Sequence, residues 1–163
     1  ASVAYIHASA TVTVGEDSVL LRIPKRVLGE LFASQPRLAA LFYAMGMLEN
    51  ISLSDRLKML GSTSGKGKLG GFLLEILGRM RTATGTHITE FELKLTQSDI
   101  GDALGMTQIH VNRLFRQLEQ DEQAIQRHGR NISILREDRL RTLACFTERS
   151  EKLDTSWFPE SRP

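Results

Sequence analysis

The side chains with the clearest chemistry lie in a short stretch that begins after Thr107. If residues 108–120 form a helix, its outward side chains are amides, an imidazole and guanidinium groups: Gln108, His110, Asn112, Arg113 and Arg116. All of these groups can donate hydrogen bonds, and the first carboxylate in the stretch is Glu119. Arginine can bind guanine through two hydrogen bonds, amides can pair with adenine, and free N–H groups at a helix start can bind phosphate. The face therefore has the chemistry of a nucleic-acid contact, although a solvated polar face is the alternative for an isolated helix.

Two short helices that meet at a tight turn are predicted to hold this face outward. Thr96, with an aspartate three residues later, forms a capping-box pattern that opens a helix over residues 97–104. Gly105 ends that helix, and Thr107 caps the second helix, which occupies residues 108–120. Because the connection is so short, the two helices must cross closely at a steep angle.

The packing of these helices also has a sequence signature. Gly101 is small enough to let the first helix approach the turn closely. Val111 is placed to point into the junction together with Leu114, Phe115 and Leu118. The opposite face of the second helix is then left for a ligand.

A basic hairpin is predicted to follow the second helix. Residues 124–127 and 131–135 alternate apolar and polar side chains and read as two short strands. His128, Gly129 and Arg130 join them, which gives a turn glycine and two potential cations at the tip. Helix, turn, helix and then a hairpin with a basic tip is the order of a winged helix-turn-helix, in which the second helix reads bases and the wing reaches phosphate.

The N-terminal part is predicted to contain β-structure followed by a short helix. Residues 10–23 alternate apolar and polar side chains around a Gly-Glu-Asp turn, which predicts a β-hairpin, and residues 2–7 suggest a further strand. Two or three strands are not stable alone in water, so they must belong to a larger sheet or pack on the next part of the chain. Pro24 closes this part, and residues 25–33 form an amphipathic pattern typical of a short helix.

A longer helix is predicted over residues 36–60, with Pro36 at its start and Gly61 at its end. Along it, apolar residues repeat at heptad spacing with one slip in register: Leu38, Leu41, Met45, Leu48, Leu53 and Leu57. This stripe predicts a dimer seam, and a purely intramolecular core is the alternative. Further apolar residues on neighbouring positions exceed what one face of a lone helix hides, which favours a partner chain.

The glycine-rich run at residues 61–67 is predicted to be a domain boundary. After it, apolar spacing predicts a helix over residues 66–81, and clean alternation predicts a strand over residues 89–95. A last helix is expected over residues 137–146, with Cys145 as a small buried apolar residue in it.

Composition narrows the classes of protein that this chain can represent. It has 163 residues, of which 41% are hydrophobic and 25% charged, and no apolar run is long enough to span a membrane. Because the net charge is only +2, any acidic partner must be bound by a local basic patch. One cysteine cannot form an intramolecular disulfide, which fits a cytoplasmic protein, and the four scattered histidines form no metal or catalytic pattern. We therefore expect neither an enzyme nor a metal site, and the missing initiator methionine suggests a fragment that begins within a domain.

Residues 95–115 read Leu-Thr-Gln-Ser-Asp-Ile-Gly-Asp-Ala-Leu-Gly-Met-Thr-Gln-Ile-His-Val-Asn-Arg-Leu-Phe, and this stretch resembles the DNA-binding domain of the Crp/Fnr family of bacterial transcription regulators. The resemblance extends through the wing and back to Ala8, where the sequence looks like the last strands of that family's cyclic-nucleotide-binding β-roll. It implies an α+β fold in four parts. These are the truncated end of a β-roll (residues 1–35), a dimerisation helix (36–61), a winged helix-turn-helix domain (62–150) and a C-terminal tail (151–163). Residues 152–163 of the tail are polar and bounded by proline, so we expect them to fray.

The same resemblance implies which residues touch DNA. Base contacts are implied for Gln108, Ile109 and Arg113, and backbone contacts are implied for Thr96, Gln97, Thr107, His110 and His128. The chemistry of the helix face and of the wing tip adds Asn112, Arg116 and Arg130. Members of the family usually have Glu where this chain has Ile109, so the usual operator sequence is not expected here.

The partners implied are double-stranded DNA with an imperfect palindrome, a second copy of the chain, and RNA polymerase. No cofactor is expected, because cyclic-AMP-responsive members have an arginine where this chain has Ala8. The alternative function is a winged-helix module for protein interaction or dimerisation, since residues 94–130 carry five acidic and five basic side chains. Steep salt dependence of binding would favour DNA over a protein partner.

Overall fold

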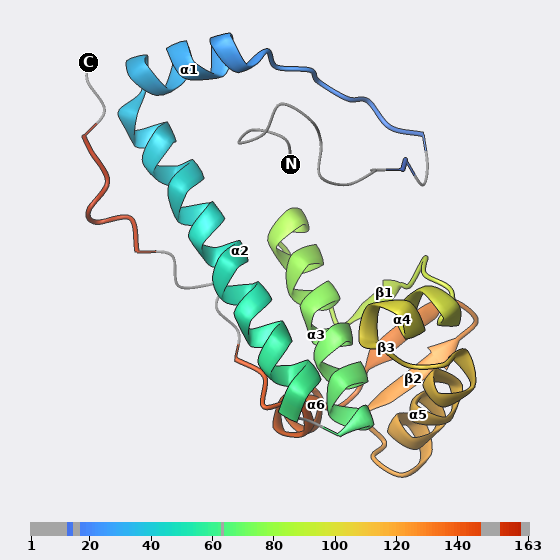
Figure 1. Ribbon diagram of the computed structural model, residues 1–163. Coiled ribbons are helices and arrows are strands. Elements are labelled where there is room, and N and C mark those ends of the chain that lie inside the picture. The colour runs from blue at the N-terminus through green and yellow to red at the C-terminus, as the bar shows by residue number, and fades with distance from the viewer. Residues whose placement is uncertain (1–12, 15–16, 63, 148–153, 161–163) are drawn as a thin grey trace. The chain divides into compact units, whose positions relative to one another are not determined.

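The computed structural model describes residues 13–14, 17–62, 64–147 and 154–160 (Figure 1). The elements follow in the order α1 (Lys25–Ser34), α2 (Pro36–Ser62), α3 (Gly65–Thr84), β1 (Glu90–Glu92), α4 (Gln97–Leu104), α5 (Gln108–Gln120), β2 (Ile125–His128), β3 (Asn131–Ile134) and α6 (Glu137–Ala144). The chain divides into two compact units, Ala1–Gly46 with Asp154–Pro163, and Met47–Leu153. The described part of the chain is thus helix-rich with one small antiparallel sheet.

The hairpin predicted over residues 10–23 is the main error of the sequence-based prediction. The described residues 13–14 and 17–24 contain no strand, and the other hairpin residues, the strand suggested over residues 2–7 and Ala8 lie outside the described residues. Val19 and Leu21 are almost fully exposed. The alternation was real, but a strand forms only where neighbouring strands accept its hydrogen bonds and another layer covers its apolar face.

The first unit contains α1, the beginning of α2 and the segment 154–160. Phe32 of α1 packs edge-on against Phe42 of α2, with ring centroids 5.2 Å apart. Phe158 is buried, and the guanidinium of Arg37 in α2 lies 5.6 Å from its ring centroid. The expectation that the C-terminal tail frays is therefore wrong for residues 154–160, because an aromatic anchor packs this segment onto the helix.

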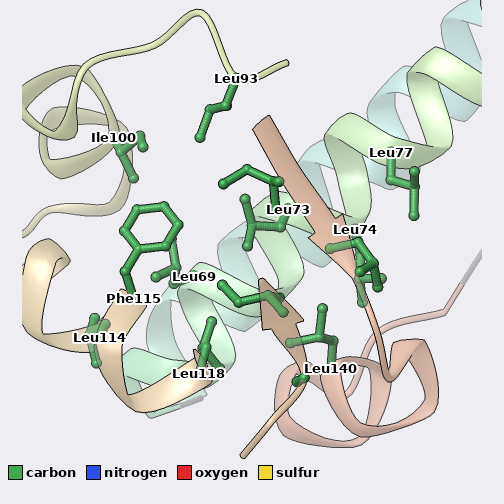
Figure 2. Close-up of a cluster of buried hydrophobic side chains, with 14 of the residues drawn as sticks. Leu69, Leu73, Leu74, Leu77, Leu93, Ile100, Leu114, Phe115, Leu118 and Leu140 are labelled. Carbon is green, nitrogen blue, oxygen red and sulfur yellow. The ribbon is translucent and has the colours of Figure 1, made fainter. Parts of the chain in front are cut away.

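The second unit has the elements of a winged helix-turn-helix. Its sheet has the order β1-β3-β2 with antiparallel pairs, in which Phe91 lies opposite Ile132, and Ile125 lies opposite Ile134. Leucines of α3 form one core with apolar side chains of α4, α5, α6 and the loop after β1, as Figure 2 shows for Leu69, Leu73, Leu74, Leu77, Leu93, Ile100, Leu114, Phe115, Leu118 and Leu140. This shared core fixes α4 and α5 against the rest of the unit.

Elements α3, β1 and α6 of this unit differ in their bounds from the sequence-based prediction. Helix α3 is longer than the predicted 66–81, because Ser64 caps its start and Gly85, with φ of 66°, ends it. Strand β1 covers only Glu90–Glu92 of the predicted 89–95. Helix α6 ends two residues early, since Cys145 has a φ of 49°, and Cys145 is exposed rather than buried as predicted.

Two carboxylates tie α6 to the other helices. Glu122 is 8% exposed and pairs with Lys66 of α3 and with Arg139 of α6, whose Nη2 lies 2.7 Å away. Glu137 accepts hydrogen bonds from Arg81 and Arg141. Hydrogen bonds from Lys66 and then Arg139 lower the pKa of Glu122 below its ordinary value of 4.5. The pKa of Glu137 is lowered in the same way by Arg81 and then Arg141.

Acid is therefore expected to destabilise this unit. A carboxylate whose folded-state pKa is depressed stabilises the fold above its ordinary value of 4.5, and this stabilisation is lost as the pH falls through the folded-state pKa. Glu122→Gln should lower the free energy of unfolding at pH 7 by about 2 kcal/mol, less than for a fully buried pair because both cations remain partly in water. Urea unfolding between pH 7 and pH 3 measures both effects. Glu92→Gln, at an exposed carboxylate, is the control, and an undiminished acid effect in Glu122→Gln would contradict the explanation.

Candidate nucleic-acid interface

The start of α4 is fixed by the predicted capping box. The Thr96 hydroxyl accepts a hydrogen bond from the N–H of Asp99 at 3.2 Å, and the Asp99 carboxylate accepts one from the N–H of Thr96 at 2.8 Å. Hydrogen bonds from the hydroxyl and then the N–H of Thr96 lower the pKa of Asp99. Two N–H groups without helical partners are thus satisfied, so α4 begins at the predicted residue.

The turn between α4 and α5 depends on two glycines. Gly105 ends α4 with a φ of 65°, a conformation that favours glycine. The N–H of Met106 donates to the carbonyl of Gly101 at 2.8 Å, and a Cβ added to Gly101 would lie 2.5 Å from the carbonyl oxygen of Met106. The prediction that Gly101 permits a close crossing is confirmed.

Helix α5 has one buried face and one outward face, as its sequence predicted. Thr107 caps it by accepting from the N–H of His110 at 3.3 Å. The buried side chains are the four predicted ones, Val111, Leu114, Phe115 and Leu118. On the other face Gln108, Arg113 and Arg116 are exposed, and Ile109 is 83% exposed. An apolar side chain with that exposure can contact a thymine methyl group in a major groove.

Three of the predicted contact residues are half-buried and already hold partners: Gln97, His110 and Asn112. The amide nitrogen of Asn112 donates to the side-chain oxygen of Gln97 at 3.1 Å, which links α5 to α4. The Nη2 of Arg113 lies 2.8 Å from Nδ1 of His110. A base contact through the amide nitrogen of Asn112 would compete with this link. Sequence spacing does not reveal the link, since residues 97 and 112 are on different helices.

The wing places its basic side chains as expected, with one difference in boundary. His128 is the last residue of β2 rather than part of the turn, and Gly129 takes a φ of 64°. The carbonyl of Arg130 accepts from the N–H of Leu93 at 2.8 Å, while the Arg130 side chain is exposed. The wing tip is therefore anchored through its backbone and leaves the side chains of His128 and Arg130 facing solvent.

A clamp between α5 and the wing was not predicted. Arg127 of β2 lies with its guanidinium 4.6 Å from the ring centroid of Phe115 and pairs with Glu119 at 2.6 Å. The N–H of Arg127 also donates to the same carboxylate at 3.0 Å. This clamp fixes the wing on α5, and it neutralises the one carboxylate of α5.

The charge balance at the interface is set by these pairs. Within the part of the chain that the structure describes, Arg113, Arg116 and Arg130 form no ion pair with a carboxylate. Glu119 and Glu122, by contrast, are held by Arg127 and by Lys66 with Arg139. These three arginines, which have no carboxylate partner, lie on α5 and at the wing tip. Of the five acidic side chains in residues 94–130, by contrast, Glu119 and Glu122 are paired with cations.

The described residues contain no group of three or more His, Cys, Asp or Glu side chains that could hold a metal ion. Among the same residues, none of the helices has the length and apolar character needed to cross a membrane.

The predicted seam residues of α2 differ in exposure within a single chain. Leu38, Leu41 and Leu48 are half-buried. Met45, Leu53 and Leu57 are 55%, 54% and 71% exposed.

Known proteins are similar to this chain in sequence and in fold. Residues 67–143 match a family profile described as a Crp-like helix-turn-helix domain. The chain is 33% identical over 101 residues to the nitrogen fixation regulation protein FixK of Azorhizobium caulinodans. The aligned region covers 62% of this chain and 41% of that protein. It is 31% identical over 127 residues to the regulatory protein HlyX of Actinobacillus pleuropneumoniae, with coverage of 77% and 51%.

The solved structure of FixK2 from Bradyrhizobium japonicum has the same fold. It superposes with a TM-score of 0.64 at 24% identity and covers 77% of this chain and 61% of that one. The chain spans about half the length, or less, of the curated relatives FixK and HlyX. By these matches residues 67–143 form a Crp-like helix-turn-helix domain, and the chain is similar in sequence to the regulatory proteins FixK and HlyX.

Proposed function

We propose that this chain is the DNA-binding part of a transcription regulator that acts as a dimer in the cytoplasm. Each subunit inserts the outward face of α5 into the major groove of double-stranded DNA. The observation that carries the proposal is the donor-rich face of α5, whose one carboxylate is neutralised by the wing. The sequence matches to regulators of the Crp/Fnr family support the same conclusion.

The residues divide into base-reading and phosphate-binding groups. Gln108, Ile109 and Arg113 occupy the first turns of α5 and are exposed, so they read base edges. Side chains around the two helix starts and on the wing bind the DNA backbone: Thr96, Gln97, Thr107, Arg116, His128 and Arg130. Free N–H groups at the start of α5 strengthen phosphate binding there.

Dimerisation through α2 supplies the second half-site. The proposed seam residues that are most exposed in one chain, Met45, Leu53 and Leu57, would be covered by a partner. Two α5 helices about 34 Å apart would match one turn of DNA, and the operator would then be an imperfect palindrome. RNA polymerase is a further partner of a regulator acting in this way.

The alternative, a winged-helix module that binds protein without reading DNA, rests on the equal numbers of acidic and basic side chains in residues 94–130. Charge pairing weakens that argument. Glu119 and Glu122 are neutralised inside the fold, whereas Arg113, Arg116 and Arg130 have no carboxylate partner among the described residues. The surface that remains is suited to phosphate.

Two single substitutions test the division of roles. Arg113→Ala should cost about 1 to 3 kcal/mol on the preferred operator and relax the preference at one base pair, because a bidentate base contact is lost. Arg130→Ala should weaken binding about equally for all sequences, because phosphate contacts carry no sequence information. Competition with operators substituted one base pair at a time measures both. Identical specificity profiles for the two variants would contradict the assignment.

A further inference from the structure

The guanidinium of Arg113 is held by a single acceptor on its own helix. Its Nη2 lies 2.8 Å from Nδ1 of His110, one turn earlier. Arginine has only donors, so Nδ1 must accept in this contact and the neutral ring carries its hydrogen on Nε2. The contact therefore depends on the protonation and identity of residue 110.

The imidazole of His110 is also held on its other side. A Cβ added to Gly65 in the first turn of α3 would lie 3.0 Å from Nε2 of His110 and 3.1 Å from Cδ2 of Leu114. The ring thus lies against the α3 backbone at a glycine, and it is half-buried. A ring fixed between α3 and Arg113 keeps Nδ1 in one place.

The rest of α5 provides no free carboxylate that could compete with His110 for the guanidinium of Arg113. Its one carboxylate, Glu119, is already bound by Arg127 through the side chain and the backbone. Holding a long side chain in its binding conformation reduces the rotamer entropy lost when it binds. The histidine can therefore raise the affinity of Arg113 for its base without touching DNA.

We propose that His110 is a positioning residue: its neutral imidazole, set against Gly65, orients Arg113 for base recognition. This inference rests on the proposed DNA-binding function and refines it. It differs from the backbone contact that the family resemblance implies for His110, in which the imidazole itself would bind phosphate. The two roles predict different dependence on Arg113.

A double-mutant cycle on the full 163-residue chain separates these roles. The probes are a duplex selected by the wild-type protein from a random pool, and the same duplex changed at the base pair whose preference Arg113→Ala abolishes. Fluorescence anisotropy gives the affinity ratio for the two duplexes. The variants are His110→Leu, His110→Asn and Arg113→Ala, with His110→Leu also combined with Arg113→Ala. His87→Leu, at an exposed histidine outside the helix-turn-helix, is the matched control.

His110→Leu should reduce the affinity ratio about 3- to 10-fold, as expected for the loss of one hydrogen bond. His110→Asn should recover most of this loss, because its side-chain oxygen can accept near the position of Nδ1. In the Arg113→Ala background, His110→Leu should have no further effect on either duplex. Far-UV circular dichroism checks that each variant is folded.

An equal loss of affinity for both duplexes that persists with Arg113→Ala would overturn the positioning role and assign His110 to a phosphate. Failure of His110→Asn to recover specificity in a folded protein would also overturn it. If the wild-type chain bound no duplex from the pool, the proposed function itself would fail.

Discussion

Replacing Met45, Leu53 and Leu57 together by serine is expected to separate the dimer and to lower the affinity for a duplex with two half-sites about 100- to 10,000-fold. The three side chains are more than half exposed in one chain, so the substitutions should cost the fold of each subunit little. Without the partner, the second half-site is no longer reached at high effective concentration, and only the affinity of one subunit remains.

Sedimentation velocity and anisotropy on the same samples measure the two parts of this prediction. Met47→Ser is the matched control, since this exposed residue of α2 lies outside the proposed seam. Sedimentation of the triple variant as the same species as the wild type would show that α2 is not the seam. A dimer lost without loss of DNA affinity would instead refute the requirement for two half-sites.

Gly101→Ala is expected to have the largest effect of any single methyl group in the helix-turn-helix. The added Cβ would lie 2.5 Å from the carbonyl oxygen of Met106, which belongs to the backbone and cannot rotate away. Overpacking of this kind costs up to about 3 kcal/mol, and the better helix propensity of alanine returns about 1 kcal/mol. We therefore expect the free energy of unfolding to fall by about 2 kcal/mol, and DNA affinity to fall because α5 is displaced.

Gly46→Ala in α2 is the control for this prediction. A Cβ there meets no atom within 4 Å, so alanine should stabilise the helix by up to about 1 kcal/mol. Urea unfolding of both variants gives the comparison. Gly101→Ala with unchanged or increased stability would mean that the turn does not require the close contact.

The helix-turn-helix could be predicted from the sequence because its boundaries are set by neighbouring residues. The capping box at Thr96, the left-handed Gly105 and the cap at Thr107 act within one turn of helix, and all three predictions are confirmed. The formation of the predicted N-terminal hairpin, by contrast, would depend on other strands and on a covering layer distant in the sequence. The alternation of apolar and polar residues predicted strands there, but it does not show which part of the protein would cover Val19 and Leu21.

Side-chain pairing at the site could not be predicted for a similar reason. The link between Asn112 and Gln97 joins two helices, and its geometry follows from their crossing angle. The clamp of Arg127 on Glu119 required the wing to fold back along α5. Cys145 was expected inside a helix, but α6 ends at the residue before it. Residue types therefore identified the outward face of α5, whereas the contacts that hold this face required the tertiary structure.

The dependence of DNA binding on salt tests the central claim most directly. If Arg116 and Arg130 of two subunits each neutralise one phosphate, the logarithm of the binding constant should fall with the logarithm of salt concentration at a slope of about −4. Replacing both arginines by alanine should make the slope shallower. The binding constant for a selected duplex with two half-sites is measured at salt concentrations from about 50 to about 200 mM, where such binding changes most. Binding that is insensitive to salt in this range would contradict the account of α5 and the wing as a DNA-binding surface.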